Sequence, residues 1–167
     1  GIGVVADASL AARLRKRRSQ MGTQPSGFTC WLARRGLQTL PLRIKQESAS
    51  ALELTKRLSQ HPNVEQVFYP GLPNHPGHEI AAKQMHGGFG GMFSFTVKGG
   101  QERAQAVIDR VQVWTPATSL GGVESLIERR AKWTGEVAGP SLLRCSTGIE
   151  DVEDLWADLE QGLETRS

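Results

Sequence analysis

The stretch Met92-Phe-Ser-Phe-Thr-Val-Lys98 decides the fold class of this chain. Apolar and polar residues alternate along it, and the apolar side comprises Phe93, Phe95 and Val97. A period of two is typical of a strand that rests one face on a core. Gly99 and the glycine after it then turn the chain toward a segment with helical periodicity. This order predicts a sheet whose buried face is covered by helices.

Further strands and helices follow from the same analysis on either side. The additional strands are Val64 to Tyr69, Val111 to Thr115 and Ser141 to Thr147. Helices are expected at His78 to Met85 and after Asp151, whose carboxylate can cap the closing helix. We therefore predict an α+β domain with a mainly antiparallel four-stranded sheet and helices on one face.

A long helical segment precedes this domain. Ala8 to Met21 is predicted as one helix, and Phe28 to Gln60 as a second that breaks or kinks near Gly36 and Pro41. The domain boundary is expected at about residue 40. The sequence opens without methionine in a short apolar run, Ile2 to Val5, which we interpret as a sign that an upstream segment has been removed.

Composition excludes several classes of protein. The 167 residues are 38% hydrophobic and 22% charged, with a formal net charge of +3, as expected of a soluble globular domain. The only dense basic run is Arg13 to Arg18, which we interpret as a solvated or intersubunit face, with nucleic-acid binding through it as a third hypothesis. No apolar run approaches the ~18 residues of a membrane span. Two distant cysteines, Cys30 and Cys145, match no metal-ligand spacing and suit a reducing cytosol, although a disulfide between them stays open.

The sequence contains no self-sufficient catalytic or metal site. His75 and His78 are three residues apart but lie in a loop-like context without a carboxylate or thiol partner, so we predict no metal site there. The glycine-rich stretch Gly87 to Gly91 precedes a strand rather than a helix, which favours a tight turn and close backbone approach over a phosphate cradle.

Two features carry more chemical content. The loop Thr118-Ser-Leu-Gly-Gly122 directly follows a predicted strand and can offer a hydroxyl and backbone donors to an anion. Arg144 lies inside a predicted strand, where its forked donors fit a carboxylate bidentately. From the residues alone, a ligand carboxylate and a structural salt bridge are equally good partners for Arg144.

Several long strings resemble one family, the pyridoxal-phosphate (PLP) enzymes of cysteine and methionine metabolism, which includes cystathionine gamma-synthase and gamma-lyase. The strings are Arg35-Gly-Leu-Gln-Thr-Leu-Pro-Leu-Arg43, Val64-Glu-Gln-Val-Phe-Tyr-Pro-Gly-Leu-Pro73, His75-Pro, Gly88-Phe-Gly-Gly-Met92, Ser119-Leu-Gly-Gly-Val-Glu-Ser-Leu-Ile-Glu128 and Leu142-Leu-Arg-Cys-Ser-Thr-Gly-Ile-Glu-Asp-Val-Glu-Asp-Leu155. They occur in order and cover essentially the whole chain.

The resemblance implies the C-terminal part of a fold-type I PLP enzyme. Residues 1–40 would be the tail of the large cofactor domain with its linking helix, and residues 41–167 the C-terminal small domain. Family members are tetramers with active sites at subunit interfaces, so a homo-oligomer is expected. The cofactor lysine lies in a Ser-x-Thr-Lys string upstream of the region that this chain resembles, and no lysine here has that context. We therefore expect neither bound cofactor nor catalytic residues in this chain alone.

The part of the site that carries over is the substrate-carboxylate clamp. By resemblance, Arg144 holds the α-carboxylate of the amino acid, and Ser119 assists through its main chain. Thr118 and Leu120 belong to the same substrate-binding loop. Thr118 stands where many gamma-synthases and gamma-lyases have glutamate, which leaves the reaction type open.

The leading hypothesis is a C-terminal fragment of a PLP-dependent trans-sulfuration enzyme, inactive alone, cytoplasmic, and acting in the complete enzyme on cystathionine, homocysteine, cysteine or activated homoserine. The alternative is a standalone, non-catalytic domain from a truncated or captured gene that self-associates or binds a partner. If Arg144 is a clamp, we expect its guanidinium to reach the loop at Ser119 and to have no acidic partner within the chain.

Overall fold

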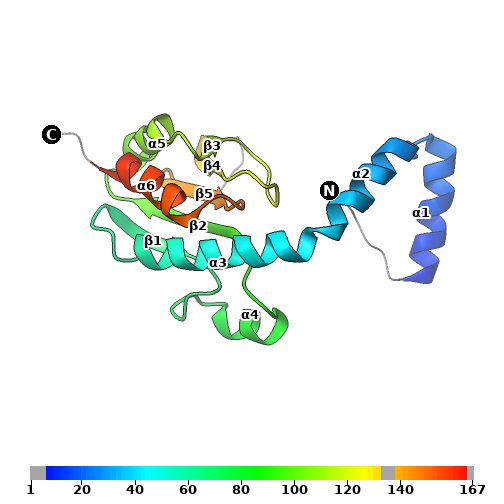
Figure 1. Ribbon diagram of the computed structural model, residues 1–167, viewed down its shortest axis with the longest axis horizontal. Coiled ribbons are helices and arrows are strands. Elements are labelled where there is room, and N and C mark those ends of the chain that lie inside the picture. Colours follow the sequence, from blue (N-terminus) through cyan, green and yellow to red (C-terminus); the bar gives the residue numbers. More distant parts are fainter. Residues whose placement is uncertain (1–6, 133–137, 165–167) are drawn as a thin grey trace. The chain divides into compact units, whose positions relative to one another are not determined.

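The computed structural model describes residues 7–132 and 138–164 and divides the chain into two compact units, residues 1–39 and 40–167. The elements appear in Figure 1. The helices are α1 (Ala8–Met21), α2 (Gly27–Gln38), α3 (Leu40–Leu58), α4 (His78–Gln84), α5 (Gly100–Arg110), the 3-10 turn η1 (Arg130–Lys132) and α6 (Val152–Leu163). The strands are β1 (Val64–Phe68), β2 (Met92–Val97), β3 (Thr115–Pro116), β4 (Leu126–Arg129) and β5 (Leu142–Ser146).

The first unit consists of two capped helices. The carboxylate of Asp7 accepts a hydrogen bond from the Leu10 N–H and begins α1, and Ser26 does the same for α2 through the Thr29 N–H. Gly22 ends α1 in the left-handed region, with φ 65°. These bounds confirm the helix predicted from Ala8 to Met21, and the break expected in the following helix occurs at Thr39, between α2 and α3.

The second unit is built on a five-stranded sheet in the order β1-β2-β5-β4-β3. Neighbours are antiparallel except β3 and β4, which are parallel. The sheet is therefore mixed. The predicted α+β domain with a mainly antiparallel sheet is confirmed, and the predicted number of four strands was wrong. Strand β4 escaped prediction because Leu126, Ile127 and Glu128 are all buried, so the sequence shows no period of two.

Of the strand predicted from Val111 to Thr115, only Thr115 lies in a strand of the structure, the two-residue β3. The reason lies in Asp158 of α6, whose carboxylate accepts hydrogen bonds from the N–H groups of Gln112, Val113 and Trp114 at 2.7–3.0 Å. Those backbone donors are satisfied by a side chain and are not available for a ladder with another strand.

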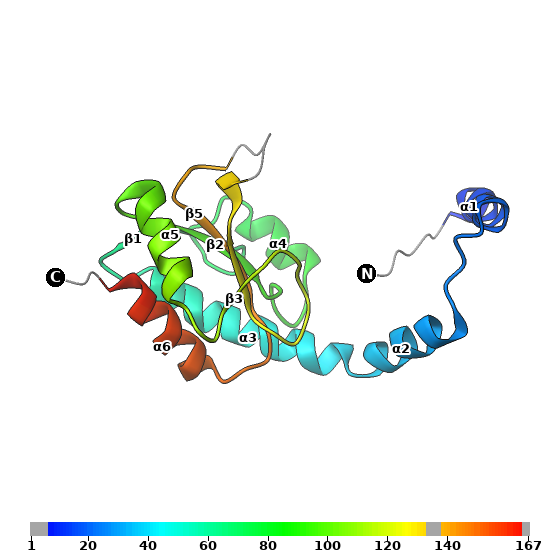
Figure 2. The ribbon, with the colours of Figure 1, turned by 90° about the horizontal axis from the view of Figure 1, so that it is seen from above.

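One face of the sheet carries the core. Helix α6 contacts both α3 and α5, and α3 and α5 contact the sheet; Figures 1 and 2 show α3 and α6 side by side. Phe93, Phe95 and Val97 of β2 point into this layer, as their alternation predicts, while none of the residues of α4 belongs to it. The side chains that the helices contribute to the core at 0% exposure include Ala51, Leu54, Leu58, Ala104, Val107, Leu155, Leu159 and Leu163. The opposite face of the sheet carries the polar side chains of Ser94, Glu128 and Arg144.

The glycine-rich stretch before β2 fits closely against α3. Gly88 has φ 143°, and a Cβ there would lie 2.6 Å from the Cβ of Ser48. The Ser48 hydroxyl accepts a hydrogen bond from the Gly90 N–H at 3.1 Å, and the Tyr69 hydroxyl donates to the Gly90 carbonyl at 2.9 Å. This close backbone approach confirms the interpretation of the stretch as a packing element.

Within the described residues, no helix combines the length and the apolarity that a membrane crossing requires.

Candidate functional site

Three polar side chains form a row across the face of the sheet opposite the core. In the pairing of β2 with β5, Ser94 lies opposite Arg144, and in the pairing of β4 with β5, Glu128 lies opposite Arg144. Side chains that are directly opposite in a sheet project from the same face and come within contact distance. Ser146, two residues after Arg144, projects from that face as well.

Arg144 contacts other groups of the protein through one nitrogen of its guanidinium. Its Nη2 lies 2.6 Å from Oε1 of Glu128 and donates a hydrogen bond to the carbonyl oxygen of Ser119 at 3.1 Å. The side chain is 25% exposed. In the described part of the chain both polar contacts of Arg144 are made by Nη2, and its Nε and Nη1 make no hydrogen bond or ion pair there.

The carboxylate of Glu128 is shared by two arginines. It is 1% exposed, and its Oε1 also accepts a hydrogen bond from Nη1 of Arg130 at 2.9 Å. The expectation that Arg144 would have no acidic partner was therefore wrong. It failed because β4 was not recognised, so nothing in the sequence placed Glu128 beside Arg144.

The loop between β3 and β4 reaches over the same face. The Gly121 N–H donates to the hydroxyl of Ser146 at 3.2 Å, and Nη1 of Arg43 donates to the Gly121 carbonyl at 3.4 Å. Ser119 has φ 122°, a backbone region that residues other than glycine rarely adopt. The residue in this conformation is the one whose carbonyl oxygen accepts the hydrogen bond from Arg144.

The structure separates the four residues predicted to bind substrate into two groups. Ser119 and Arg144 are brought into contact, as expected. Thr118 and Leu120 are exposed in the same loop, Leu120 at 60%, and among the described residues neither makes a hydrogen bond or ion pair with Arg144. Their part in binding stays a prediction.

A second set of contacts joins the start of β4 to the end of β5. The carboxylate of Glu150 accepts hydrogen bonds from the N–H and the hydroxyl of Ser125 at 2.7 and 2.9 Å, and the Ser125 hydroxyl accepts one from the Gly148 N–H at 2.8 Å. Sequence reasoning missed Ser125, Glu150, Glu128 and Arg43 as supporting residues. The signal was their presence within the strings that carry the family resemblance.

Comparison with known proteins identifies the family. The profile described as Cys/Met metabolism PLP-dependent enzyme matches residues 1–164. This chain belongs to that family. A cystathionine gamma-synthase of Mycobacterium leprae is 49% identical over 149 residues, which are 85% of this chain and 38% of the relative. A cystathionine gamma-lyase of Dictyostelium discoideum is 41% identical over 175 residues, covering 98% of this chain and 45% of the relative.

Solved structures agree with the sequence relatives. The metB structure from Corynebacterium glutamicum superimposes with a TM-score of 0.91 at 42% identity, over 96% of this chain and 43% of that chain. Cystathionine gamma synthase from Xanthomonas oryzae pv. oryzae, in complex with aminoacrylate and cysteine, gives a TM-score of 0.87 at 40% identity. The chain spans about two fifths of the length of the curated relatives that it matches.

The groups around Arg144 suit an anion and not the aldehyde of PLP, the cofactor that the family name implies. The protein atoms that contact Arg144 are a carboxylate and a carbonyl oxygen, neither of which can form an imine. The family's Ser-x-Thr-Lys string does not occur in this sequence. A guanidinium is a group that binds carboxylates by charge-assisted hydrogen bonds.

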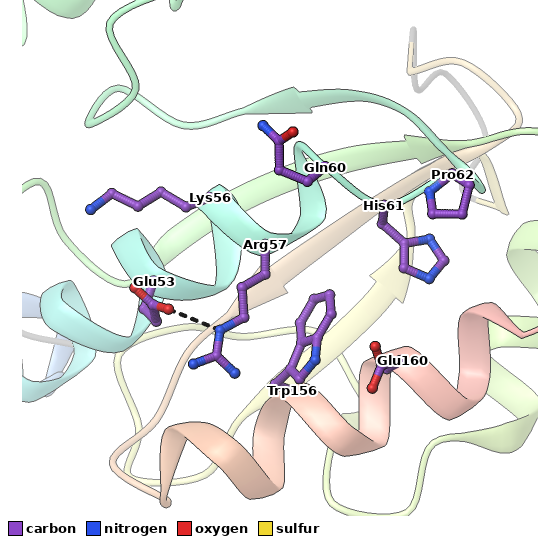
Figure 3. Close-up of a pocket in the computed structure, with 8 residues that line it drawn as sticks. All are labelled: Glu53, Lys56, Arg57, Gln60, His61, Pro62, Trp156 and Glu160. Atoms are coloured by element: carbon purple, nitrogen blue, oxygen red, sulfur yellow. Dashed lines mark hydrogen bonds and ion pairs between the residues drawn. The ribbon is translucent and has the colours of Figure 1, made fainter.

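A groove between α3 and α6 is the main competing location, and its side chains are held in structural contacts (Figure 3). Arg57 pairs with Glu53 at 2.9 Å and with Glu153 at 2.6 Å, and its guanidinium lies 5.8 Å from the ring centre of Trp156. The hydrogen bonds that Arg57 donates to Glu153 and Glu53 raise the pKa of Arg57, and the bond from Arg57 lowers the pKa of Glu153. Arg57 therefore links α3 to α6 on the helical layer.

The histidines and cysteines of the described residues form no second functional site. His78 Nδ1 lies 2.8 Å from the Pro70 carbonyl oxygen, and His75 Nδ1 accepts a hydrogen bond from the Gly77 N–H. Within the described residues, no group of three potential ligands could hold a metal ion. Both cysteines are free thiols, with Cys30 exposed and Cys145 buried. Burial raises the pKa of the Cys145 thiol well above its ordinary value, against an opposing effect of Arg144.

Proposed function

We propose that this chain supplies the α-carboxylate clamp of a PLP-dependent trans-sulfuration enzyme of the cystathionine gamma-synthase or gamma-lyase type. The observation that supports it is the position of Arg144, whose side chain is 25% exposed and contacts Glu128 and the Ser119 carbonyl through Nη2 alone among the described residues. A guanidinium forms charge-assisted hydrogen bonds with a carboxylate. By their names, the relatives reported above form or cleave cystathionine, which gives the proposal its substrate class.

The function of such a clamp is to position the substrate. Binding both carboxylate oxygens at a rigid strand fixes the orientation of the amino acid's Cα, and orientation of this kind accounts for a large share of enzymatic rate enhancement. The Ser119 loop completes the clamp through its main chain, because the side-chain hydroxyl is not what contacts Arg144.

We further propose that the complete enzyme contains the large cofactor domain, with residues 1–40 as its tail and residues 41–167 as the small domain. The chain alone is then inactive and binds no cofactor covalently, since it has no lysine in the family's string. Two free thiols favour a cytosolic protein.

The clamp is tested in the complete enzyme with Arg144→Ala. We expect KM for the amino-acid substrate to rise by about tenfold or more, the loss that follows removal of a charge-assisted contact. An unchanged KM would show that Arg144 does not bind the substrate carboxylate.

The cofactor statement is tested on the chain itself. After incubation with pyridoxal phosphate and reduction with borohydride, mass spectrometry should find no lysine labelled in stoichiometric amount. Stoichiometric labelling of any one of Lys16, Lys45, Lys56, Lys83, Lys98 or Lys132 would contradict the proposal.

A second candidate function is a non-catalytic domain that self-associates or binds a partner. The observation that favours it is the exposed apolar surface of α2, where Phe28 is 68% and Trp31 is 54% exposed. Apolar side chains gathered in this way usually find another protein surface.

A further inference from the structure

We propose that Ser146 is a positioning residue that fixes the loop of residues 118–122 beside Arg144, so that the main chain of this loop shares in binding the substrate carboxylate. The inference rests on the proposed function of Arg144 and deepens it, because it names the side chain that keeps the second part of the clamp in place. Two hydrogen bonds between the loop and β5 carry it.

Arg144 by itself cannot offer two parallel donors to a carboxylate. Its Nη2 contacts Oε1 of Glu128 at 2.6 Å and the carbonyl oxygen of Ser119 at 3.1 Å, one contact for each of its two hydrogens. A guanidinium has two edges with parallel donors, Nε with Nη2 and Nη1 with Nη2, and both include Nη2. A substrate carboxylate at either edge therefore receives one donor from Arg144 and needs a second donor from another group.

The loop beside Arg144 can supply that second donor. Thr118, Ser119 and Leu120 are exposed, and in the described part of the chain their backbone N–H groups make no hydrogen bond. Such a loop binds well only if it is already held in one conformation, because ordering a mobile segment costs free energy on binding. With φ 122° at Ser119, backbone preference does not hold this conformation, so contacts with the rest of the fold must do so.

Ser146 provides such a contact from the sheet. Its hydroxyl accepts a hydrogen bond from the Gly121 N–H at 3.2 Å, and the residue is 3% exposed in β5, a strand with a neighbour on either side. Arg144 and Ser146 project from the same face of β5, and they hold Ser119 and Gly121, which are likewise two residues apart. The loop is therefore attached to a rigid strand at two points.

Of the two side chains that contact Gly121, Ser146 is the firmer attachment. Nη1 of Arg43 donates to the Gly121 carbonyl at 3.4 Å, which is long for a hydrogen bond. Arginine also has a long side chain with many rotamers to restrict, whereas the hydroxyl of a serine is one bond from its Cβ. The strand therefore determines where the Ser146 hydroxyl lies, and with it the position of Gly121.

Three substitutions separate the hydroxyl from the packing around it. Ser146→Ala removes the acceptor and little volume. Ser146→Thr keeps a hydroxyl on the same Cβ, and a β-branched residue suits a strand. Ser94→Ala is the matched control, because Ser94 lies opposite Arg144 on the same face of the sheet, but among the described residues its hydroxyl makes no hydrogen bond with the loop.

Hydrogen exchange in the 167-residue chain measures the attachment directly. By NMR, the Gly121 N–H should exchange about fivefold faster in Ser146→Ala than in the parent, as expected for the loss of one hydrogen bond. Its exchange should stay close to the parent rate in Ser146→Thr and in Ser94→Ala. Equal exchange in the parent and in Ser146→Ala would overturn the inference.

Kinetics of the complete enzyme measure the effect on substrate. Ser146→Ala should raise KM for the amino-acid substrate by about fivefold with little change in kcat, because the carboxylate is bound equally in the ground state and the transition state. Ser146→Thr and Ser94→Ala should keep the parent KM. An equal rise in KM for Ser146→Ala and Ser146→Thr would assign the effect to packing and overturn the role of the hydroxyl.

The same kinetics distinguish this inference from the proposed function. If Arg144→Ala raises KM and Ser146→Ala does not, the clamp stands and the positioning role of Ser146 is overturned. If neither substitution changes KM, the clamp itself is rejected, and the role of Ser146 in substrate binding is rejected with it.

Discussion

Nη2 of Arg144 and Oε1 of Glu128 form a 2.6 Å ion pair between neighbouring strands β5 and β4. Sequence reasoning treated a ligand carboxylate and a structural salt bridge as alternative partners for Arg144. The structure shows the salt bridge, and within the described residues it leaves the Nε and Nη1 donors of the guanidinium without a hydrogen bond. The two interpretations are therefore compatible, and a loss of stability alone cannot distinguish them.

The ion pair predicts an intermediate stability loss for Arg144→Ala. Breaking a buried pair typically costs roughly 3–5 kcal/mol, but Glu128 keeps its contact with Arg130, so we expect about 1–2 kcal/mol. Arg130→Ala should cost a similar amount. The double variant should lose more than the sum of the two, because it removes both arginines from a buried carboxylate. Urea denaturation measures all three, and strictly additive losses would contradict the shared-carboxylate arrangement.

The backbone of Ser119 predicts that Ser119→Gly is stabilising. A non-glycine residue at φ 122° is strained, and relief of that strain should outweigh the added flexibility of the unfolded chain, for a net gain of about 1 kcal/mol. Since the contact with Arg144 uses the carbonyl, KM in the complete enzyme should not change. Leu120→Gly is the control, because Leu120 has no positive φ and should lose stability. A large rise in KM for Ser119→Gly would assign the role to the hydroxyl instead.

The buried carboxyl group of Glu47 is expected to make the stability of the chain depend on pH. It is 2% exposed, its Oε1 has no hydrogen-bond partner among the described residues, and burial raises its pKa above the ordinary 4.5, against an opposing effect of Arg43. A raised folded pKa means that the stability contribution is complete below the unfolded pKa and is lost as pH rises through the folded pKa.

Glu47→Gln imitates the protonated form, so it should stabilise the chain at neutral pH. We expect a thermal midpoint about 3 °C higher at pH 7.5, the shift that roughly 1 kcal/mol gives at this size, and no difference near pH 4. Calorimetry at both pH values checks this. A variant less stable than the parent at pH 7.5 would show that the ionised carboxylate is stabilising.

The exposed apolar side chains of α2 predict self-association of the isolated chain. Phe28 and Trp31 stack with ring centres 5.9 Å apart, and both are more than half exposed. Symmetric dimers are the commonest way to cover such a surface. Light scattering should detect dimers or larger species at high concentration, and the double substitution Phe28→Ser and Trp31→Ser should reduce them.

Ile80→Ser is the control for that experiment, because Ile80 is 62% exposed but belongs to α4 in the other unit. A clean monomer of the parent chain at high concentration would reject self-association. Ile2 and Val4, which the sequence also suggested for this surface, lie outside the described residues.

The sequence alone determined the elements whose signals are local. The alternation along β2 gave its buried face, Asp151 marked the start of α6 by its cap, and the helix from Ala8 to Met21 was predicted with the bounds that α1 has. The family resemblance singled out Arg144 and Ser119, which the fold brings into contact. Each of these features depends on residues close together in the chain, or on strings that relatives share.

Only the tertiary structure decided which strands and side chains contact one another. Strand β4 is buried on both faces and shows no periodicity, and the backbone before β3 is paired by Asp158, more than 40 residues away. Glu128 contacts Arg144 because two strands 16 residues apart lie in register. A buried carboxylate is stable only where the fold supplies its counter-charges, and those positions are set by strand order and register, which no local pattern encodes.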